Sequence, residues 1–149
     1  MKNLMLVFAT VFVTGSIFAQ TAVEKKAADM VKFQELSYDF GKIKQGVPVT
    51  HDFVFSNVSN NPVIIESATA SCGCTTPVKP EPPVAKGKSD KITAGFNAAA
   101  VGPFNKSIYV KVAGIDNPVE IKITGEVLTT ADYANYEKTK GKPTKSGGK

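Results

Sequence analysis

The sequence predicts an all-β fold, and three observations support this prediction. From residue 31 to residue 127, apolar residues recur at every second position, which is the pattern of half-buried strands. Clusters of glycine, proline and asparagine interrupt the pattern where one strand should end and the next begin. No stretch of this region has the period of an amphipathic helix. About seven short strands in roughly 100 residues are typical of an immunoglobulin-like antiparallel β-sandwich.

The first segment, residues 1–19, is typical of a cleavable signal peptide. Lys2 precedes an apolar run over residues 4–13, and the small residue Ala19 provides a cleavage position. The run is shorter than the roughly 20 apolar residues that cross a bilayer, so we expect no transmembrane segment in the mature chain. We therefore expect an exported protein with a periplasmic or extracellular location.

The rest of the chain divides into three parts. Residues 20–30 are a short polar lead-in, and residues 31–128 are the immunoglobulin-like domain. Residues 129–149 form a lysine-rich tail without hydrophobic periodicity, which we expect to be disordered.

Each expected strand of the domain has one apolar face. In the last strand, Ile121 and Ile123 alternate with Glu120 and Lys122. Residues 63–65 are continuously apolar, which favours deeper burial. Pro80, Pro82 and Pro83 exclude regular pairing around them, so residues 77–88 are expected to be an extended loop that crosses between the sheets. The expected strands lie around residues 31–38, 49–56, 63–65, 90–97, 107–112 and 119–127.

The charge distribution argues against a nucleic-acid partner. The formal net charge is +5, but all 18 basic residues are lysine. Recognition of phosphates and base edges depends largely on the bidentate guanidinium group of arginine. Between residues 30 and 128, ten lysines face nine acidic residues, so the excess positive charge lies mainly in the tail.

One motif carries candidate chemistry, namely Ser71-Cys72-Gly73-Cys74-Thr75. In an extended chain, residues two apart point to the same face, so both sulfur atoms should lie side by side. Three interpretations stay open: two buried thiols, a small and easily reduced disulfide, or a pair of thiolates for a soft metal ion. A metal site usually needs three or four ligands. Cys72 and Cys74 are therefore weak metal candidates, and the single histidine, His51, is expected to pack within a strand.

Other motifs give no indication of enzyme activity. Gly87-Lys88-Ser89 imitates the end of a phosphate-binding loop, but the first glycine of that motif would fall at Pro82, which has no backbone N–H. We find no nucleophile-elbow or zinc-protease pattern. We therefore expect no catalytic residue and no cofactor.

Several short motifs occur in a characteristic order. They are Phe40-Gly41-Lys42-Ile43, Phe53-Val54-Phe55-Ser56-Asn57, the Ser-Cys-Gly-Cys-Thr motif, Gly102-Pro103-Phe104 and Ile123-Thr124-Gly125-Glu126-Val127. With these motifs the chain resembles the secreted bacterial "domain of unknown function 1573" family over residues 33–127, and that family resembles the immunoglobulin-like domains of the major sperm protein, ASH and Hydin group. The resemblance implies an immunoglobulin-like fold in the cell envelope or outside the cell, and it implies no activity, substrate or catalytic residue.

The leading hypothesis from the sequence is an exported, non-catalytic binding or scaffolding module whose partner is a protein or another envelope component. A sandwich has open sheet edges and end loops that can dock such a partner. We expect the contact to lie over residues 71–88, with Cys72 and Cys74 shaping it. The alternative is a thiol redox or soft-metal-handling protein that uses the same two cysteines.

Overall fold

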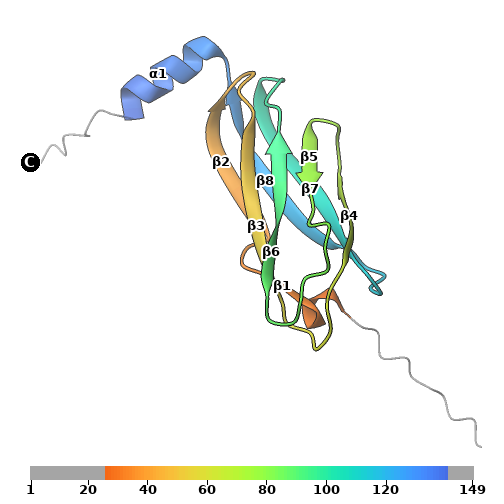
Figure 1. Ribbon diagram of the computed structural model, residues 1–149. Coiled ribbons are helices and arrows are strands. Elements are labelled where there is room, and N and C mark those ends of the chain that lie inside the picture. Colours follow the sequence, from red (N-terminus) through yellow and green to blue (C-terminus); the bar gives the residue numbers. More distant parts are fainter. Residues whose placement is uncertain (1–25, 141–149) are drawn as a thin grey trace, which may run out of the picture.

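The computed structural model describes residues 26–140, and within them eight strands form two four-stranded sheets packed as a sandwich (Figure 1). One sheet has the strand order β1-β3-β6-β5 and the other β2-β8-β7-β4. The predicted all-β sandwich is confirmed, with eight strands in place of about seven. The elements are η1 (Ala27–Asp29), β1 (Val31–Phe33), β2 (Ser37–Lys44), β3 (Val49–Asn57), β4 (Ile65–Ala70), β5 (Thr75–Val78), β6 (Ser89–Phe96), β7 (Gly102–Val112), β8 (Val119–Leu128) and α1 (Thr130–Lys140).

Two strands are additional to the six ranges expected. One is β5, in which Pro77 and Val78 pair with β6. The expectation of an unpaired loop over residues 77–88 that crosses between the sheets is therefore wrong: this segment joins two strands of the same sheet.

The other additional strand arises because the chain changes sheets where a single strand over residues 31–38 was expected. β1 pairs antiparallel with β3, and the chain then crosses to the second sheet, where β2 pairs parallel with β8. Backbone hydrogen bonds hold the crossing on both sides: Gln34 N–H donates to Val54 O, and Lys122 N–H donates to Leu36 O. The expectation of a purely antiparallel sandwich is therefore wrong for β2 and β8. Alternation indicates which face of a strand is buried and says nothing of its neighbours.

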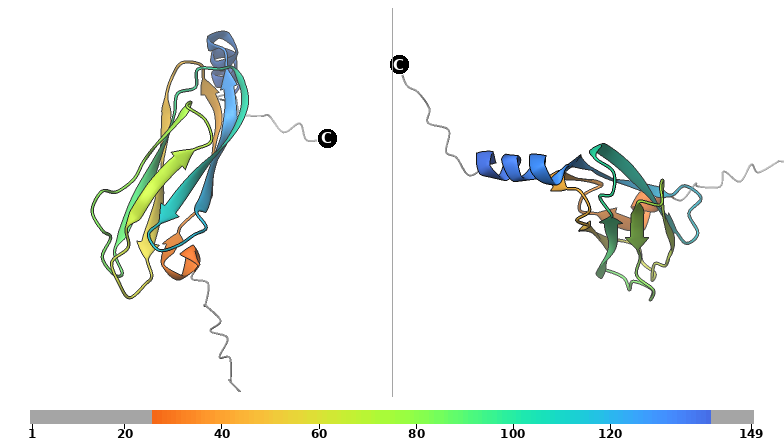
Figure 2. Two further views of the ribbon diagram at one scale, coloured as in Figure 1. Left: turned by 90° about the vertical axis from the view of Figure 1, so that its right-hand side faces the viewer. Right: turned by 90° about the horizontal axis from the view of Figure 1, so that it is seen from above.

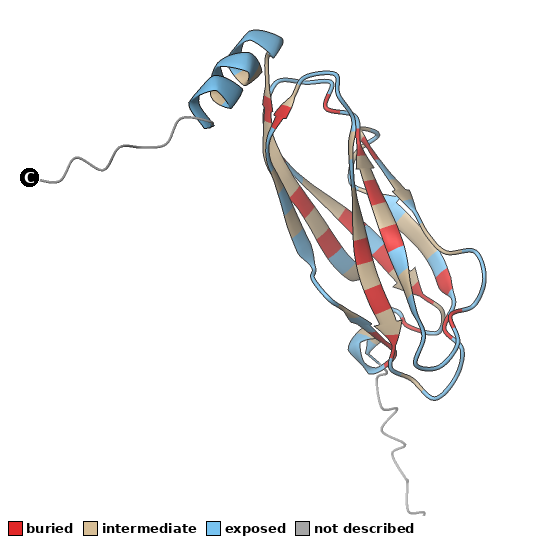
Figure 3. Cartoon of the chain, turned by 60° about the vertical axis from the view of Figure 1, so that its left-hand side comes forward, coloured by how far each residue is buried: buried red, intermediate tan, exposed pale blue. Residues whose placement is uncertain are grey.

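The core lies between the sheets and consists of the inward-facing residues of the strands. Figure 3 shows buried residues alternating with intermediate or exposed ones along several of the strands. The predicted deep burial of the whole run 63–65 is wrong for its middle residue: Val63 and Ile65 are buried, but Ile64 is 46% exposed because the alternation continues through it. The largest fully buried side chains include Phe53, Phe55, Ile65, Ile92, Ile108, Ile121 and Ile123.

The C-terminal segment corrects a second expectation. Residues 130–140, predicted to be disordered, form the helix α1, which begins at the opposite end of the sandwich from η1 and projects away from it (Figures 1 and 2). Thr129 caps the helix: its hydroxyl accepts a hydrogen bond from Asp132 N–H at 3.1 Å and donates to Asp132 Oδ2 at 2.6 Å. None of the helix residues is buried.

Three sequence expectations fall outside the described residues. The signal peptide at residues 1–19, the first part of the lead-in at residues 20–25 and the last part of the tail at residues 141–149 are all in this group. The described end of the lead-in is not wholly polar, since Met30 is only 7% exposed and belongs to the core. Across residues 26–140, no helix combines the length and the apolar character that a membrane crossing requires.

Candidate functional site

The predicted cysteine motif forms the turn that joins β4 to β5 and so connects the two sheets. Cys72 and Cys74 form a disulfide with a Cα–Cα distance of 5.4 Å, within the range of ordinary disulfides. Of the three interpretations left open by the sequence, the structure contains the disulfide. We call residues 71–75 the disulfide turn.

Neighbouring groups fix the disulfide turn at both of its ends. Ser71 N–H donates to Ser107 O at 2.9 Å, and Ser107 N–H donates to Ser71 Oγ at 3.2 Å. At the other end, Thr75 is buried, and its hydroxyl lies 3.6 Å from the Sγ atom of Cys72. Asn97 N–H also donates to Cys74 O at 3.1 Å. Both cysteines are partly exposed, so the disulfide lies at the surface on a rigid support.

The possible metal ligands of the sequence do not converge. His51 lies on β3 and faces β2, where its ring stacks on Tyr38 with the centroids 3.5 Å apart and its Nε2 lies 2.7 Å from Glu35 Oε1. The prediction that His51 packs within a strand is confirmed. The cysteine sulfurs are bonded to each other and are not thiolates in this form. In the part of the chain that the structure describes, no three His, Cys, Asp or Glu side chains are arranged to hold a metal ion.

The segment 71–88, expected to act as one loop, is divided between the two ends of the sandwich. The disulfide turn lies at the end where α1 begins, and β5 then runs toward the opposite end (Figure 1). There Val84 pairs with Val63, and Lys86 Nζ donates to Asn60 Oδ1 at 2.8 Å. The two halves of the segment therefore cannot contribute to one compact contact site.

Each of the two sheets ends in two edge strands, which differ in length and composition. The edge strands are β1 and β5 in the first sheet and β2 and β4 in the second. β1 has three residues, and β5 has four, one of them Pro77. β2 is longer, but a bulge between Asp39 and Lys42 interrupts its pairing, and its charged side chains discourage a further strand.

The edge of β4 has fewer of these protective features: its pairing with β7 is irregular only near its start, between Ile65 and Ser67, and is regular from Ser67 to Ala70. Its six residues, Ile-Glu-Ser-Ala-Thr-Ala, include one charge and no lysine or proline. In an antiparallel pair, the backbone N–H groups of successive residues point alternately toward the partner strand and away from it. Ser71 N–H points toward β7, so the N–H groups of Ala68 and Ala70 point away from β7, out of the sheet. Figure 2 (left) views the side of the sandwich on which β4 and β5 lie. This edge was not predicted from the sequence, although the absence of lysine and proline from residues 65–70 is visible there.

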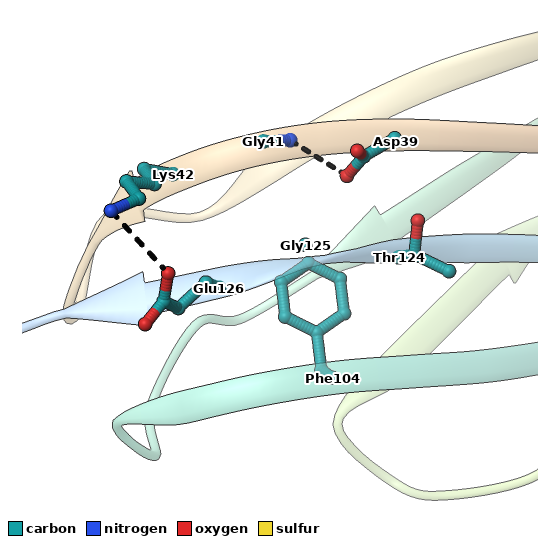
Figure 4. Close-up of a pocket in the computed structure, with 7 residues that line it drawn as sticks. All are labelled: Asp39, Gly41, Lys42, Phe104, Thr124, Gly125 and Glu126. Atoms are coloured by element: carbon teal, nitrogen blue, oxygen red, sulfur yellow. Dashed lines mark hydrogen bonds and ion pairs between the residues drawn. The ribbon is translucent and has the colours of Figure 1, made fainter.

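A hollow of about 350 Å³ lies beside the bulge of β2, and Figure 4 shows the residues that line it. Asp39 Oδ1 accepts a hydrogen bond from Gly41 N–H at 2.9 Å, and Lys42 Nζ lies 3.7 Å from Glu126 Oε2. The ring of Phe104 lies against Gly125. Lys42 and Glu126 thus form an exposed ion pair at the rim of this hollow, and the Asp39 carboxylate is held by the backbone of the bulge.

Two carboxyl groups have altered acidity, and both lie on exposed outer faces of the sheets. A hydrogen bond from Lys91, and then one from Thr93, lower the pKa of Asp52. A hydrogen bond from Ser107 is the main cause that lowers the pKa of Glu120. Lowered values in exposed pairs are typical of surface ion pairs and not of an acid or base for catalysis.

These features define an immunoglobulin-like β-sandwich with one long open edge that ends at a disulfide turn. The chain belongs to the family described as Protein of unknown function (DUF1573), whose model matches residues 31–127. The resemblance drawn from the sequence motifs is therefore confirmed. A comparison with curated proteins yields no significant match.

Several solved structures have a similar fold. A protein of unknown function from Porphyromonas gingivalis W83 has a TM-score of 0.56 at 15% identity, over 65% of this chain and 46% of that one. The ASH / PapD-like domain 7 of human CEP192 has a TM-score of 0.53 at 10% identity, over 87% of this chain and 98% of that domain. The secreted serine protease VesC from Vibrio cholerae has a TM-score of 0.55 at 14% identity, over 77% of this chain and 26% of the protease. At these identities the likeness shows the fold alone, and the chain spans less than half the length of the first of these proteins.

Proposed function

We propose that this protein is an exported, non-catalytic binding module of the cell envelope that docks an extended segment of a partner protein on the free edge of β4. The observation that carries the proposal is this edge, which has no lysine and no proline in its six residues and is regularly paired with β7 from Ser67 to Ala70. Such an edge presents a row of unpaired N–H and C=O groups, and an added strand satisfies them.

Two features support export. Residues 1–19 have the composition of a signal peptide. The Cys72–Cys74 disulfide is consistent with an oxidising compartment, because disulfides form and persist in exported proteins. Purification of the protein from the envelope fraction, followed by mass measurement of its N-terminus, tests this part of the proposal. An intact Met1 on cytoplasmic protein would contradict it.

The absence of catalysis is supported by the arrangement of the polar groups in residues 26–140. The two carboxyl groups whose pKa values are lowered, Asp52 and Glu120, form exposed pairs on the outer faces of the sheets. Reactive carboxylates usually lie in clefts that exclude water. We therefore assign the module no catalytic residue and no cofactor.

The decisive experiment blocks the β4 edge without disturbing the sheet. Ala68→Pro removes an N–H group that faces away from β7, and proline is tolerated at such positions of an edge strand. A photo-crosslinking residue placed at Thr69 reports the partner in the producing cells. We expect an adduct from the otherwise native protein and its loss in Ala68→Pro. In the reconstituted complex, hydrogen exchange should slow at the Ala68 and Ala70 amides.

A matched pair of lysine variants separates a blocked edge from a general change in charge. Thr69→Lys places a positive charge on β4, and Ser37→Lys places the same charge on β2, the other edge of the same sheet. Thr69→Lys should abolish the complex, and Ser37→Lys should preserve it. Equal loss in both variants, or unchanged exchange at the Ala68 amide, would contradict docking on β4.

A second candidate function uses the disulfide directly. Both cysteines are partly exposed, and thiol–disulfide exchange requires such access. Soft-metal handling would in addition require the reduced pair. Acid trapping and alkylation of the protein in intact cells distinguishes these roles: a substantial reduced fraction supports redox or metal chemistry, and complete oxidation supports a structural disulfide.

A further inference from the structure

A second hollow lies at the end of the sandwich where α1 begins, directly beside the disulfide turn. Its volume is about 180 Å³, and its lining includes Cys74 and the loop at residues 97–101. This volume is smaller than the roughly 300–1,000 Å³ of sites for drug-sized ligands. One water molecule takes about 30 Å³, so the hollow has the volume of several waters. That volume is enough for one amino-acid side chain with its terminal group.

The walls of this hollow are mainly apolar. Phe96 and Phe104 stack with their ring centroids 4.1 Å apart, and both rings contribute to the lining. Val101 lies in the same lining and is 50% exposed, so part of the apolar surface is open to solvent. An apolar side chain of a ligand would bury against these three residues.

The lining contains one charged residue, Lys106. Its position between Phe104 and Ile108 on β7 places it on the inward-facing side of the strand, where a lysine is unusual. Its ammonium group makes no hydrogen bond or ion pair with any residue in the range 26–140 that the structure describes. A cation beside an apolar hollow is complementary to a ligand group that carries a negative charge on an apolar body.

A residue between two lining residues, Asn97 and Ala99, has an uncommon backbone conformation. Ala98 has a φ of +50°, and within residues 26–140 no other residue except glycine has a positive φ. Such a conformation persists only where surrounding contacts determine it. Here Ala98 is fully buried, and its carbonyl accepts a hydrogen bond from Gly46 N–H at 2.9 Å. The wall is thus preformed, as in many binding sites.

We infer that this hollow binds the C-terminal residue of a partner peptide, with an apolar side chain against Phe96, Phe104 and Val101 and the terminal carboxylate paired with Lys106. A peptide source fits the position, because the free edge of β4 ends at the disulfide turn that borders the hollow. This inference rests on the proposed binding function, since it names the group of the partner that the module recognises. It assigns no role to the disulfide beyond forming a wall.

The test uses nuclear magnetic resonance titration of the full mature protein with the peptide acetyl-Gly-Gly-Leu. We expect saturable shifts at the amides of Asn97, Val101 and Lys106. The same peptide with a C-terminal carboxamide should bind about tenfold more weakly or worse, because it lacks the charge-assisted hydrogen bond. Equal binding of the acid and the carboxamide would overturn the inference.

Variants assign the effect to the lysine. Lys106→Gln should weaken the acid peptide about tenfold and leave the carboxamide unchanged, and Lys106→Arg should retain binding. Lys88→Gln is the matched control, because Lys88 lies at the opposite end of the sandwich and its side chain also has no partner in the described range.

Hexanoate distinguishes a peptide from another source of the carboxylate, because it has an apolar chain and a carboxylate but no peptide bond. If hexanoate binds as tightly as acetyl-Gly-Gly-Leu, the assignment of a peptide ligand is overturned.

The failure of this inference is distinguishable from the failure of the proposed function. Unperturbed spectra with acetyl-Gly-Gly-Leu, together with loss of the cellular adduct in Ala68→Pro, would remove the carboxylate site and leave docking on β4 intact. Saturable binding of the peptide in Ala68→Pro would show that the hollow acts independently of the strand edge.

Discussion

At the scale of single residues, Asn57 is the most heavily bonded buried polar group of the domain. It is 1% exposed, and its Nδ2 donates to the carbonyl oxygens of Asn61 and Val84, both at 2.8 Å. Its Oδ1 accepts hydrogen bonds from the N–H and hydroxyl of Ser59. One side chain thus joins the end of β3 to the loop that follows it and to the segment before β6.

Replacing Asn57 by alanine should therefore destabilise the protein substantially. Asn57→Ala leaves buried partners unsatisfied, and the expected loss is about 1–3 kcal/mol in the free energy of unfolding. Urea denaturation measures this loss. The neighbouring Asn60, which is exposed and bonds only to Lys86, provides the control: Asn60→Ala should change stability by less than about 0.5 kcal/mol. Similar costs for the two variants would contradict the assigned role of Asn57.

Gly125 is the second residue whose identity is determined by its surroundings. A Cβ atom at this position would lie 2.7 Å from Phe104 Cζ and 2.8 Å from the carbonyl oxygen of Gly41, and the φ of Gly125 is +156°. We expect Gly125→Ala to destabilise the protein by about 1–3 kcal/mol, as overpacking does. Gly73→Ala should be nearly neutral, because a Cβ there meets nothing within 4 Å. Thermal melting of both variants checks the prediction, and a neutral Gly125→Ala would refute it.

At the scale of secondary-structure elements, β3 and β6 are joined on their outer face by an ionic contact. Lys91 Nζ lies 2.6 Å from Asp52 Oδ2, and the hydroxyl of Thr93 donates to Asp52 Oδ1 at 2.5 Å. Both hydrogen bonds favour the charged carboxylate, which is why the pKa of Asp52 is lower than its ordinary value of 3.8.

The lowered pKa predicts the direction of a pH effect. Because the native pKa is below the unfolded one, ionised Asp52 stabilises the native state above pH 3.8, and this contribution disappears as the pH falls through the native pKa. Asp52→Asn should therefore show a shallower loss of stability in acid than the native chain. Lys91→Gln should reduce the slope in the same direction. Chemical denaturation between pH 2 and pH 6 measures the slopes, and an unchanged slope in Asp52→Asn would contradict the argument.

The disulfide turn should contribute little to global stability. Cys72 and Cys74 close a very short loop, for which the chain-entropy model gives less than about 2 kcal/mol. Reduction should therefore leave a folded sandwich with a modestly lower melting temperature. Circular dichroism with and without reductant measures the change, and the variant with both cysteines replaced by alanine is the control. Complete unfolding on reduction would show that the turn nucleates the fold.

The strands and the helix differ in how well they could be predicted from the sequence. Alternation identified the buried faces of β3, β6, β7 and β8 correctly, because burial against a single core imposes a period of two. It did not identify the change of sheets between β1 and β2, although the apolar positions shift there from odd numbers in β1 to even numbers at the start of β2. α1 was missed because it buries no residue, although Thr129 with Asp132 three residues later is a helix-start signal.

The candidate site was predictable only in part. The cysteine motif was recognisable, and spacing suggested that the sulfurs are neighbours, but spacing alone left thiol, disulfide and metal interpretations open. The edge position of β4 depends on strand order, which is a property of contacts between distant segments. Lys106, on β7, and the loop at residues 97–101, between β6 and β7, line one hollow together with Cys74. That arrangement likewise depends on how distant segments pack.

At the scale of the whole molecule, α1 is an appendage of the sandwich. Its contacts with the domain include Lys42 Nζ, which lies 5.3 Å from the centroid of the Tyr136 ring. Contacts of this kind at exposed sites contribute about 0.5–1 kcal/mol. The helix therefore adds little to the stability of the sandwich.

Removal of the helix should leave the domain folded. A chain that ends at Thr129 should unfold at nearly the same urea concentration as the full chain, within about 1 kcal/mol. Lys42→Ala in the full chain is the control, because it removes only the contact with Tyr136 and the ion pair with Glu126. A much less stable truncated chain would mean that the helix packs more tightly than its exposure indicates.

The parallel pairing of β2 with β8 has a consequence for how the molecule is made. Within residues 26–140, the second strand of the domain has one sheet neighbour, which is the last strand, and Lys44 pairs with Leu128. A nascent polypeptide that lengthens from its N-terminus cannot complete this sheet until synthesis has passed Leu128. Contacts between such remote segments also slow folding. The incomplete chain remains open during that interval, so the sandwich closes late in synthesis.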